Sequence, residues 1–147
     1  MSYSRLRKGR VSEQGRAYFI TTVTASRVNL FEDWRCARLL VREMRTLHEA
    51  GVVQSIAWVV MPDHLHWLFV LQEGCIGAVM KLLKGRSARK LKPFCAFKSV
   101  WQPAYYDQAL RDNQDLKTFA RYIVANPLRA GLVKRMGDYP HWDAEWL

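Results

Sequence analysis

The chain has 147 residues, of which 50% are hydrophobic and 24% are charged. This length fits one folded domain, and this composition excludes a disordered or low-complexity chain. The 23 lysines and arginines outnumber the 13 aspartates and glutamates, which gives a net charge of +10 and predicts a polyanionic partner such as nucleic acid.

The distribution of apolar residues and cysteines argues against membrane and secreted proteins. The longest apolar run, Ile56–Met61, is far shorter than the roughly 20 residues of a membrane helix. The cations within residues 1–10 are not followed by the apolar stretch of a secretory signal. An odd number of widely spaced cysteines indicates neither a disulfide framework nor a zinc ribbon: Cys36, Cys75 and Cys95. We therefore expect a cytoplasmic protein that has no membrane partner.

The first half of the chain predicts a strand, a helix and a hairpin. Arg16–Ala25 is rich in aromatic and β-branched residues, which favour a strand. Asp33 can cap a helix that runs to about Ala50 and ends before a glycine. Two further β-rich runs, Val52–Val60 and His64–Leu71, are joined by a short segment with Pro and Asp, which favours a tight turn. These two runs should therefore pair as an antiparallel hairpin.

The second half predicts two more helices with a strand between them. Gly77–Leu91 has apolar residues at helical spacing, and a fourth strand is expected within Phe97–Ala109. Asp112 or Asn113 can cap a third helix, whose apolar stripe ends near Asn126-Pro127. The element order is then β-α-β-β-α-β-α.

This order predicts an α+β fold with a ferredoxin-like (RRM-like) antiparallel sheet and helices on one face. The other face would be free for a ligand. We expect a single domain over residues 1–147, with a basic arm at 1–14 and a C-terminal tail at 134–147. The tail would either fold over the ligand site or pack on the sheet.

The third predicted strand carries two histidines on one face. Strand alternation puts one continuous apolar row toward the core: Leu65, Trp67, Phe69 and Leu71. His64 and His66 then point to the opposite face from Cα atoms about 6.5 Å apart, so both rings can converge on one cation. The alternative is a pair of histidines on an exposed strand, because H-x-H also recurs by chance. Their position opposite an apolar row favours a ligand.

The third helix carries a phenol and an amide on one side. Tyr122 and Asn126 are four residues apart, at the border of the apolar stripe. The alternatives are that Tyr122 packs as an amphipathic residue and that Asn126 caps the turn begun by Pro127. Asn126 could both cap this turn and project its amide beside the phenol of Tyr122.

A run of cations without acids occupies the middle of the chain. No Asp or Glu occurs between Glu73 and Asp107, and seven cations fall there: Lys81, Lys84, Arg86, Arg89, Lys90, Lys92 and Lys98. We call these residues the basic strip. Such a run is often only a solvated face, but in a chain of this net charge it favours contact with a phosphate backbone. The aromatic residues Trp101, Tyr105 and Tyr106 could stack unpaired bases beside it.

These segments together resemble the REP-associated tyrosine transposases, within the HUH single-tyrosine transposases. Four motifs occur in the order of that family and cover nearly the whole chain. They are the segments Gly15–Thr21, Trp58–His66 with its His-Leu-His, Val100–Pro103, and Arg121–Pro127 followed by Gly131-Leu132-Val133.

The resemblance implies a ferredoxin-like sheet that carries the two histidines and a helix that carries a nucleophilic tyrosine. These enzymes cut single-stranded DNA next to a hairpin. On that pattern His64 and His66 would hold Mg²⁺ or Mn²⁺, and Tyr122 would attack the scissile phosphate to form a 5′-phosphotyrosine. Relatives in the wider family use a Gln four residues after the tyrosine as third ligand, and Asn126 stands at that position here. The N-terminal cations would join the basic strip on the DNA: Arg5, Arg7, Lys8 and Arg10.

Three functions are compatible with these residues. The first is a metal-dependent DNA strand transferase acting on a single-stranded hairpin, as a monomer or a homodimer. The second is a domesticated, non-catalytic protein that binds structured single strands through the basic strip. The third is a metal-dependent phosphodiesterase that uses water as its nucleophile. A covalent adduct with DNA would single out the first.

Overall fold

Five strands form one antiparallel sheet in the computed structural model, which describes residues 12–144. The strands are β1 (Ala17–Val23), β2 (Val53–Met61), β3 (His64–Leu71), β4 (Tyr106–Ala109) and β5 (Trp142–Ala144). Their order in the sheet is β4-β1-β3-β2-β5, and every neighbouring pair is antiparallel. The order β4-β1-β3-β2 is the ferredoxin-like arrangement, so the predicted α+β class and element order are confirmed.

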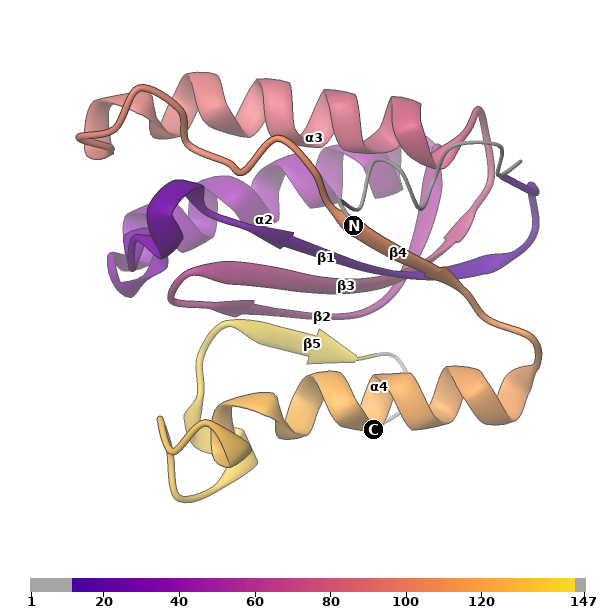
Figure 1. Ribbon diagram of the computed structural model, residues 1–147. Coiled ribbons are helices and arrows are strands. Elements are labelled where there is room, and N and C mark those ends of the chain that lie inside the picture. The colour runs from indigo at the N-terminus through magenta and orange to yellow at the C-terminus, as the bar shows by residue number, and fades with distance from the viewer. Residues whose placement is uncertain (1–11, 145–147) are drawn as a thin grey trace.

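Helices cover both faces of the sheet (Figure 1). Helices α2 (Trp34–Glu49) and α3 (Ile76–Leu91) lie on one face, and α4 (Asn113–Arg129) lies on the other. Short 3-10 turns occur in the connections, at Ala25–Arg27, Leu30–Glu32, Lys92–Phe94 and Met136–Asp138.

Helix α2 forms as its sequence predicts. The Asp33 carboxylate accepts a hydrogen bond of 3.0 Å from the Arg35 backbone N–H, which caps the first turn. Gly51 ends the helix at a φ of +75°, a conformation that glycine adopts without strain. The apolar stripe of the helix is buried against the sheet through Cys36, Leu40, Met44 and Leu47.

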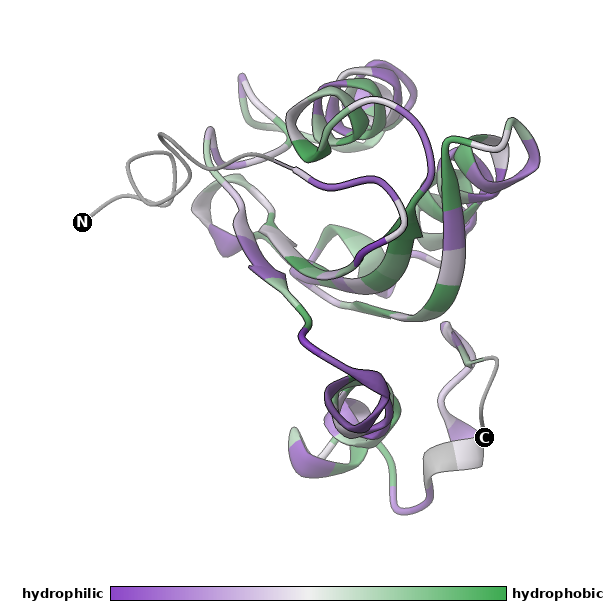
Figure 2. Ribbon diagram, turned by 90° about the vertical axis from the view of Figure 1, so that its right-hand side faces the viewer, coloured by the Kyte–Doolittle hydropathy of each residue, from purple (hydrophilic) through white to green (hydrophobic). Residues whose placement is uncertain are grey.

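The position of α4 differs from the prediction that helices lie on one face only. Leu116, Ala120 and Ile123 pack against Phe19 and Leu68, which point away from α2 and α3. Figure 2 shows this second layer below the sheet, with apolar segments of the strands between the layers. The strands are apolar on both faces, and burying the second apolar face stabilises the fold, so α4 covers the face that was expected to stay open.

The end of α4 also differs from expectation, whereas the tail takes one of its two expected positions. Helix α4 continues through Pro127 to Arg129, although it was predicted to end near Asn126-Pro127. A proline in the last turn removes a single donor, and the turn is closed beyond it because Leu132 N–H donates to the Pro127 carbonyl at 3.0 Å. The tail packs on the sheet, where β5 pairs with Ala57–Val59 at the edge of β2.

Within residues 12–144, no helix combines the length and the apolar character needed to cross a bilayer. The N-terminal cations Arg5, Arg7, Lys8 and Arg10 lie outside the residues that the structure describes.

Candidate active site

Strand β3 turns its two histidines toward α4, because alternate residues of a strand point to opposite faces. Leu65, Trp67 and Phe69 are fully buried in the core beneath α2 and α3. His66 is only 8% exposed and lies between β1 and α4, while His64 at the start of the strand is half-buried. The face assignment predicted from the sequence is therefore confirmed, although the face of the histidines is not open.

The two imidazoles lie side by side, and each is held through its Nδ1 atom. The ring centroids of His64 and His66 are 4.7 Å apart. Nδ1 of His64 lies 2.6 Å from Asp63 Oδ1, and Nδ1 of His66 lies 2.8 Å from Thr21 Oγ1. In the described part of the chain, neither Nε2 atom has a hydrogen-bond partner. Anchoring one ring nitrogen while the other stays available is the arrangement found around metal-bound histidines.

Burial and neighbouring groups favour a neutral His66 and an ionised Asp63, and both forms favour cation binding. Burial, together with the charges of His64 and Arg129, lowers the pKa of His66 to about 3, so its imidazole is neutral near pH 7. Burial opposes the charge of Asp63, but hydrogen bonds with His64 and Arg27 lower its pKa below the ordinary value. A neutral imidazole such as that of His66 can bind a metal through its free nitrogen, and the Asp63 carboxylate orients the neighbouring His64 ring for the same purpose.

Helix α4 brings Tyr122 to this pair. The Asp112 carboxylate caps the helix by accepting from Asp115 N–H at 2.9 Å. Ile123 is fully buried on the sheet, and Tyr122 beside it remains 43% exposed at the rim. The ring centroid of Tyr122 lies 5.8 Å from that of His66 and 6.1 Å from that of Phe19, both in edge-on contact. The structure thus brings the phenol next to the imidazole pair.

Asn126 lies one turn after Tyr122, where Arg129 contacts both residues. The guanidinium carbon of Arg129 lies 4.0 Å from the Tyr122 ring centroid, in a cation–π contact. Its Nη2 donates to the Tyr122 carbonyl at 3.0 Å and to Asn126 Oδ1 at 3.4 Å. The sequence analysis missed Arg129. Its spacing of seven residues from Tyr122, which puts both on one side of a helix, was the available signal.

The donor set fits a hard or borderline divalent cation. Within residues 12–144, no group of three or more His, Cys, Asp and Glu side chains could hold a metal by itself. Two imidazole nitrogens plus an amide oxygen from Asn126 is a set that accepts Mn²⁺ or Mg²⁺ and contains no thiolate. The Nε2 atoms of His64 and His66 make no hydrogen bond to any residue from 12 to 144, which supports this fit. Asn126 could join only if Arg129 released its Oδ1 atom.

Most cations of the basic strip have partners inside the protein. Arg86 and Lys90 both pair with the buried Glu43 carboxylate of α2, which is 2% exposed. The Lys84 ammonium donates to the Gln102 carbonyl at 2.6 Å. That of Lys92 donates to the carbonyls of residues 97 and 98, both at 2.7 Å. These four cations therefore have structural roles.

A groove of about 630 Å³ runs between α3 and the segment 98–103. Arg89 and Lys98 line it together with Lys84 and Lys92, and Lys81 is exposed on the same helix. Since α3 and α4 lie on opposite faces of the sheet, this groove does not adjoin Tyr122. Trp101 and Tyr105, expected as stacking platforms, are only 6% and 7% exposed.

Comparison with known proteins, by sequence and by structure, finds similarity to transposases. Residues 14–126 match the family described as "Transposase IS200 like". The REP-associated tyrosine transposase of Escherichia coli (strain K12) is 32% identical over 84 residues, which are 57% of this chain and 50% of that protein. The chain therefore spans about half the length of that relative. A relative from Haemophilus influenzae (strain Rd) is 26% identical, and the match covers 87% of this chain and 79% of that protein.

The fold agrees with a solved structure of the same class. The structure of a REP-associated tyrosine transposase bound to a REP hairpin superposes with a TM-score of 0.77 at 26% identity. The superposition covers 90% of this chain and 79% of that chain. The resemblance stated from the sequence motifs is thereby confirmed. Taken with the family match over residues 14–126, it shows that this chain belongs to the IS200-like transposase family and is similar to the REP-associated tyrosine transposases.

Proposed function

We propose that this protein is a metal-dependent strand transferase that cleaves single-stranded DNA next to a REP-like hairpin through a 5′-phosphotyrosine intermediate. The observation that carries the proposal is the contact between the rings of Tyr122 and His66, at 5.8 Å, beside the imidazole of His64. The structural relative bound to a REP hairpin supports a hairpin as the DNA partner.

The proposed reaction exchanges one phosphoester for another. The phenol oxygen of Tyr122 attacks the scissile phosphorus, and the bond from phosphorus to the 3′ oxygen of the preceding nucleotide breaks. The phenol proton leaves to solvent, and the departing 3′ oxygen is protonated to a hydroxyl. The phosphotyrosine ester conserves the bond energy, so a 3′-hydroxyl can reverse the step without ATP.

The residues around Tyr122 divide the remaining tasks. A divalent cation held by His64, His66 and Asn126 would supply Lewis-acid stabilisation of charge on the phosphate. Asp63 and Thr21 orient the two imidazoles. The guanidinium beside the Tyr122 ring stabilises negative charge as it develops on the phenol oxygen and the phosphate.

DNA binding is assigned to the cations that the fold leaves available. Of the exposed cations in the basic strip, Lys81, Arg89 and Lys98 have side chains that make no hydrogen bond or ion pair within residues 12–144, and the last two line the groove along α3. The N-terminal cations Arg5 and Arg7, with Lys8 and Arg10, complete the proposed DNA contacts. A basic surface on the face opposite Tyr122 suits a hairpin stem, whose phosphates bind without base contacts.

A covalent-adduct assay tests the proposal. The protein is incubated with 3′-labelled single-stranded DNA that carries a hairpin, with Mg²⁺ or Mn²⁺ and separately with a chelator. We expect a labelled adduct on denaturing gels that requires the metal and is lost in Tyr122→Phe. Tyr106→Phe, which removes a phenol from β4, is the matched control and should retain the adduct.

Two results would replace this function. Hairpin binding without an adduct under any divalent metal would select the non-catalytic DNA-binding protein. A hydroxyl-terminated product without an adduct would select the phosphodiesterase that uses water. An adduct that persists in Tyr122→Phe would refute the assignment of the nucleophile.

A further inference from the structure

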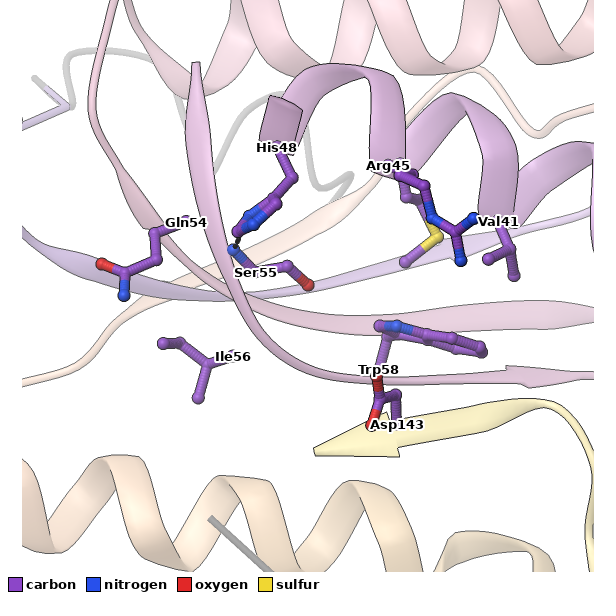
Figure 3. A pocket seen from close by; sticks show the side chains of 9 residues that line it. Val41, Arg45, His48, Gln54, Ser55, Ile56, Trp58 and Asp143 are labelled. Carbon is purple, nitrogen blue, oxygen red and sulfur yellow. Dashed lines mark hydrogen bonds between the residues drawn. The ribbon is translucent and has the colours of Figure 1, made fainter. Parts of the chain in front are cut away.

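A second pocket lies on the side of the sheet that α2 covers, away from Tyr122 (Figure 3). Its volume is about 390 Å³. Helix α2 forms one wall, β2 forms the floor, and β5 contributes one residue at the edge. The lining residues are Val41, Met44, Arg45, His48, Gln54, Ser55, Ile56, Trp58 and Asp143.

The α2 wall presents hydrogen-bond donors. Nδ1 of His48 accepts from the Ser55 backbone N–H at 3.1 Å, at an irregularity in the pairing of β2 with β3. Because Nδ1 is an acceptor, the neutral ring carries its proton on Nε2 and can donate from there. Arg45 is exposed one turn before His48, and in Figure 3 its guanidinium points from α2 toward Trp58. This wall suits a phosphate.

The floor presents an aromatic ring and a carboxylate. Trp58 is only partly buried against the core, so part of its indole is accessible in the pocket. Asp143 lies directly opposite Trp58 in the β2–β5 register. Its Oδ1 accepts from the Ala144 backbone N–H at 2.8 Å, which fixes the orientation of the exposed carboxylate. An ionised carboxylate only accepts hydrogen bonds, so it selects a ligand that has a donor.

We propose that this pocket binds one unpaired nucleotide of single-stranded DNA, with the base on Trp58, an exocyclic amine on Asp143 and the phosphate on Arg45 and His48. An aromatic platform beside a cation is the usual way to hold an unstacked base. A carboxylate accepts well from the N4 amine of cytosine. In thymine the N3–H donor lies between two carbonyl oxygens, which repel the carboxylate, so the pocket discriminates against thymine.

Helix α2 extends the pocket into a longer track. Trp34, Arg38, Arg45 and His48 recur at spacings of three, four and seven residues, which places them along one side of the helix. Trp34 is 66% exposed and offers a second aromatic surface. With a rise of about 1.5 Å per residue, Trp34 and Arg45 lie roughly 16 Å apart along the axis, which is the span of a few extended nucleotides.

This assignment rests on the proposed function for its choice of single-stranded DNA, and the experiment separates the two. Fluorescein-labelled dC8 and dT8 are titrated with the protein by fluorescence anisotropy in the presence of a chelator, so no cleavage is involved. We expect dC8 to bind at least about fivefold more tightly than dT8. Asp143→Asn should bring the two affinities together, since an amide also offers a donor to the thymine carbonyls.

The other variants test stacking and phosphate contact. Trp58→Phe keeps an aromatic ring in the floor and should weaken both oligonucleotides by about threefold to tenfold. Arg45→Ala should weaken both more than Arg42→Ala, which removes the same charge from α2 but does not line the pocket. Circular dichroism of each variant checks that it is folded.

The results distinguish failure of the pocket from failure of the proposed chemistry. Equal affinity of the native protein for dC8 and dT8, or a preference that survives Asp143→Asn, would overturn the pocket assignment even if the Tyr122 adduct forms. Equal effects of Arg45→Ala and Arg42→Ala would do the same. A preference for dC8 that depends on Asp143, in a protein that forms no adduct, would refute the strand transferase and retain the pocket.

Discussion

Arg129→Ala provides the sharpest test of the site around Tyr122. In the structure this guanidinium stacks on the Tyr122 ring and donates to the Tyr122 carbonyl and to the Asn126 amide oxygen. The phenol becomes negatively charged as it attacks, so the interaction with Arg129 is stronger in the transition state than in the resting enzyme. Removing the guanidinium should therefore slow adduct formation rather than weaken DNA binding.

The expected loss of rate in Arg129→Ala follows from the distance between the guanidinium and the phenol. The charge develops on the phenol oxygen, beyond the ring centroid, so the 4.0 Å between the guanidinium carbon and that centroid sets an upper limit: two unit charges at this distance interact by about 4 kcal/mol at an effective dielectric of 20 and about 2 kcal/mol at 40. Arg129 is exposed, and water and salt screen exposed charges, so the smaller value applies. Because about 1.4 kcal/mol corresponds to tenfold in rate, we expect a loss of about tenfold to 30-fold.

The assay is single-turnover adduct formation at saturating protein, with hairpin affinity measured separately by anisotropy. Arg129→Lys keeps the charge but not the planar stacking group, and should lose about threefold to tenfold. Arg121→Ala removes the same charge from the exposed side of α4 and is the control. If Arg129→Ala forms adduct as fast as Arg121→Ala, or if its whole effect is on affinity, the role of Arg129 in the chemistry is refuted.

Three further outcomes concern stability. Burial opposes ionisation of Glu43, but its two cationic partners on α3 lower its pKa below the ordinary 4.5, so its stabilisation is present above that pH and is lost as the pH falls through the lowered pKa. Glu43→Gln should lower the free energy of unfolding by about 1–2 kcal/mol at pH 7, and urea titrations should show this difference shrinking as the pH falls below 4.5. His66 has its pKa lowered to about 3, so only the unfolded chain takes up this proton below pH 6.5. With chelator present, the free energy of unfolding should fall by about 1.4 kcal/mol for each unit by which the pH is lowered below 6.5. His66→Gln should flatten that slope. Tyr139→Phe removes a hydrogen bond to the Val60 carbonyl and should cost about 1 kcal/mol, measured as a lower Tm.

The strand order and the faces on which His64, His66 and Tyr122 lie could be predicted, because they depend on local periodicity. The alternation of apolar and polar residues in β3 fixed which way His64 and His66 point, and the helical spacing in α4 placed Tyr122 beside its apolar stripe. Both signals are carried by residues a few positions apart. The ferredoxin-like strand order then follows from the sequence of elements, since few topologies fit it.

The remainder depends on contacts between residues far apart in the chain. Glu43 pairs with both Arg86 and Lys90 from 43 and 47 residues away, so the run of cations without local acids gave no sign of these ion pairs. The position of α4 on the second face depends on whether another element already covers that face, which periodicity does not report. Strand β5, with only three residues, is too short to give a recognisable pattern.

The packing of α4 on the sheet of its own chain has a kinetic consequence. Tyr122 and both imidazoles come from one polypeptide, so no exchange of a helix with a second copy is needed to assemble them. With DNA in large excess, the initial velocity of adduct formation should rise with the first power of the protein concentration. Mixing inactive Tyr122→Phe and His66→Ala chains should restore no activity.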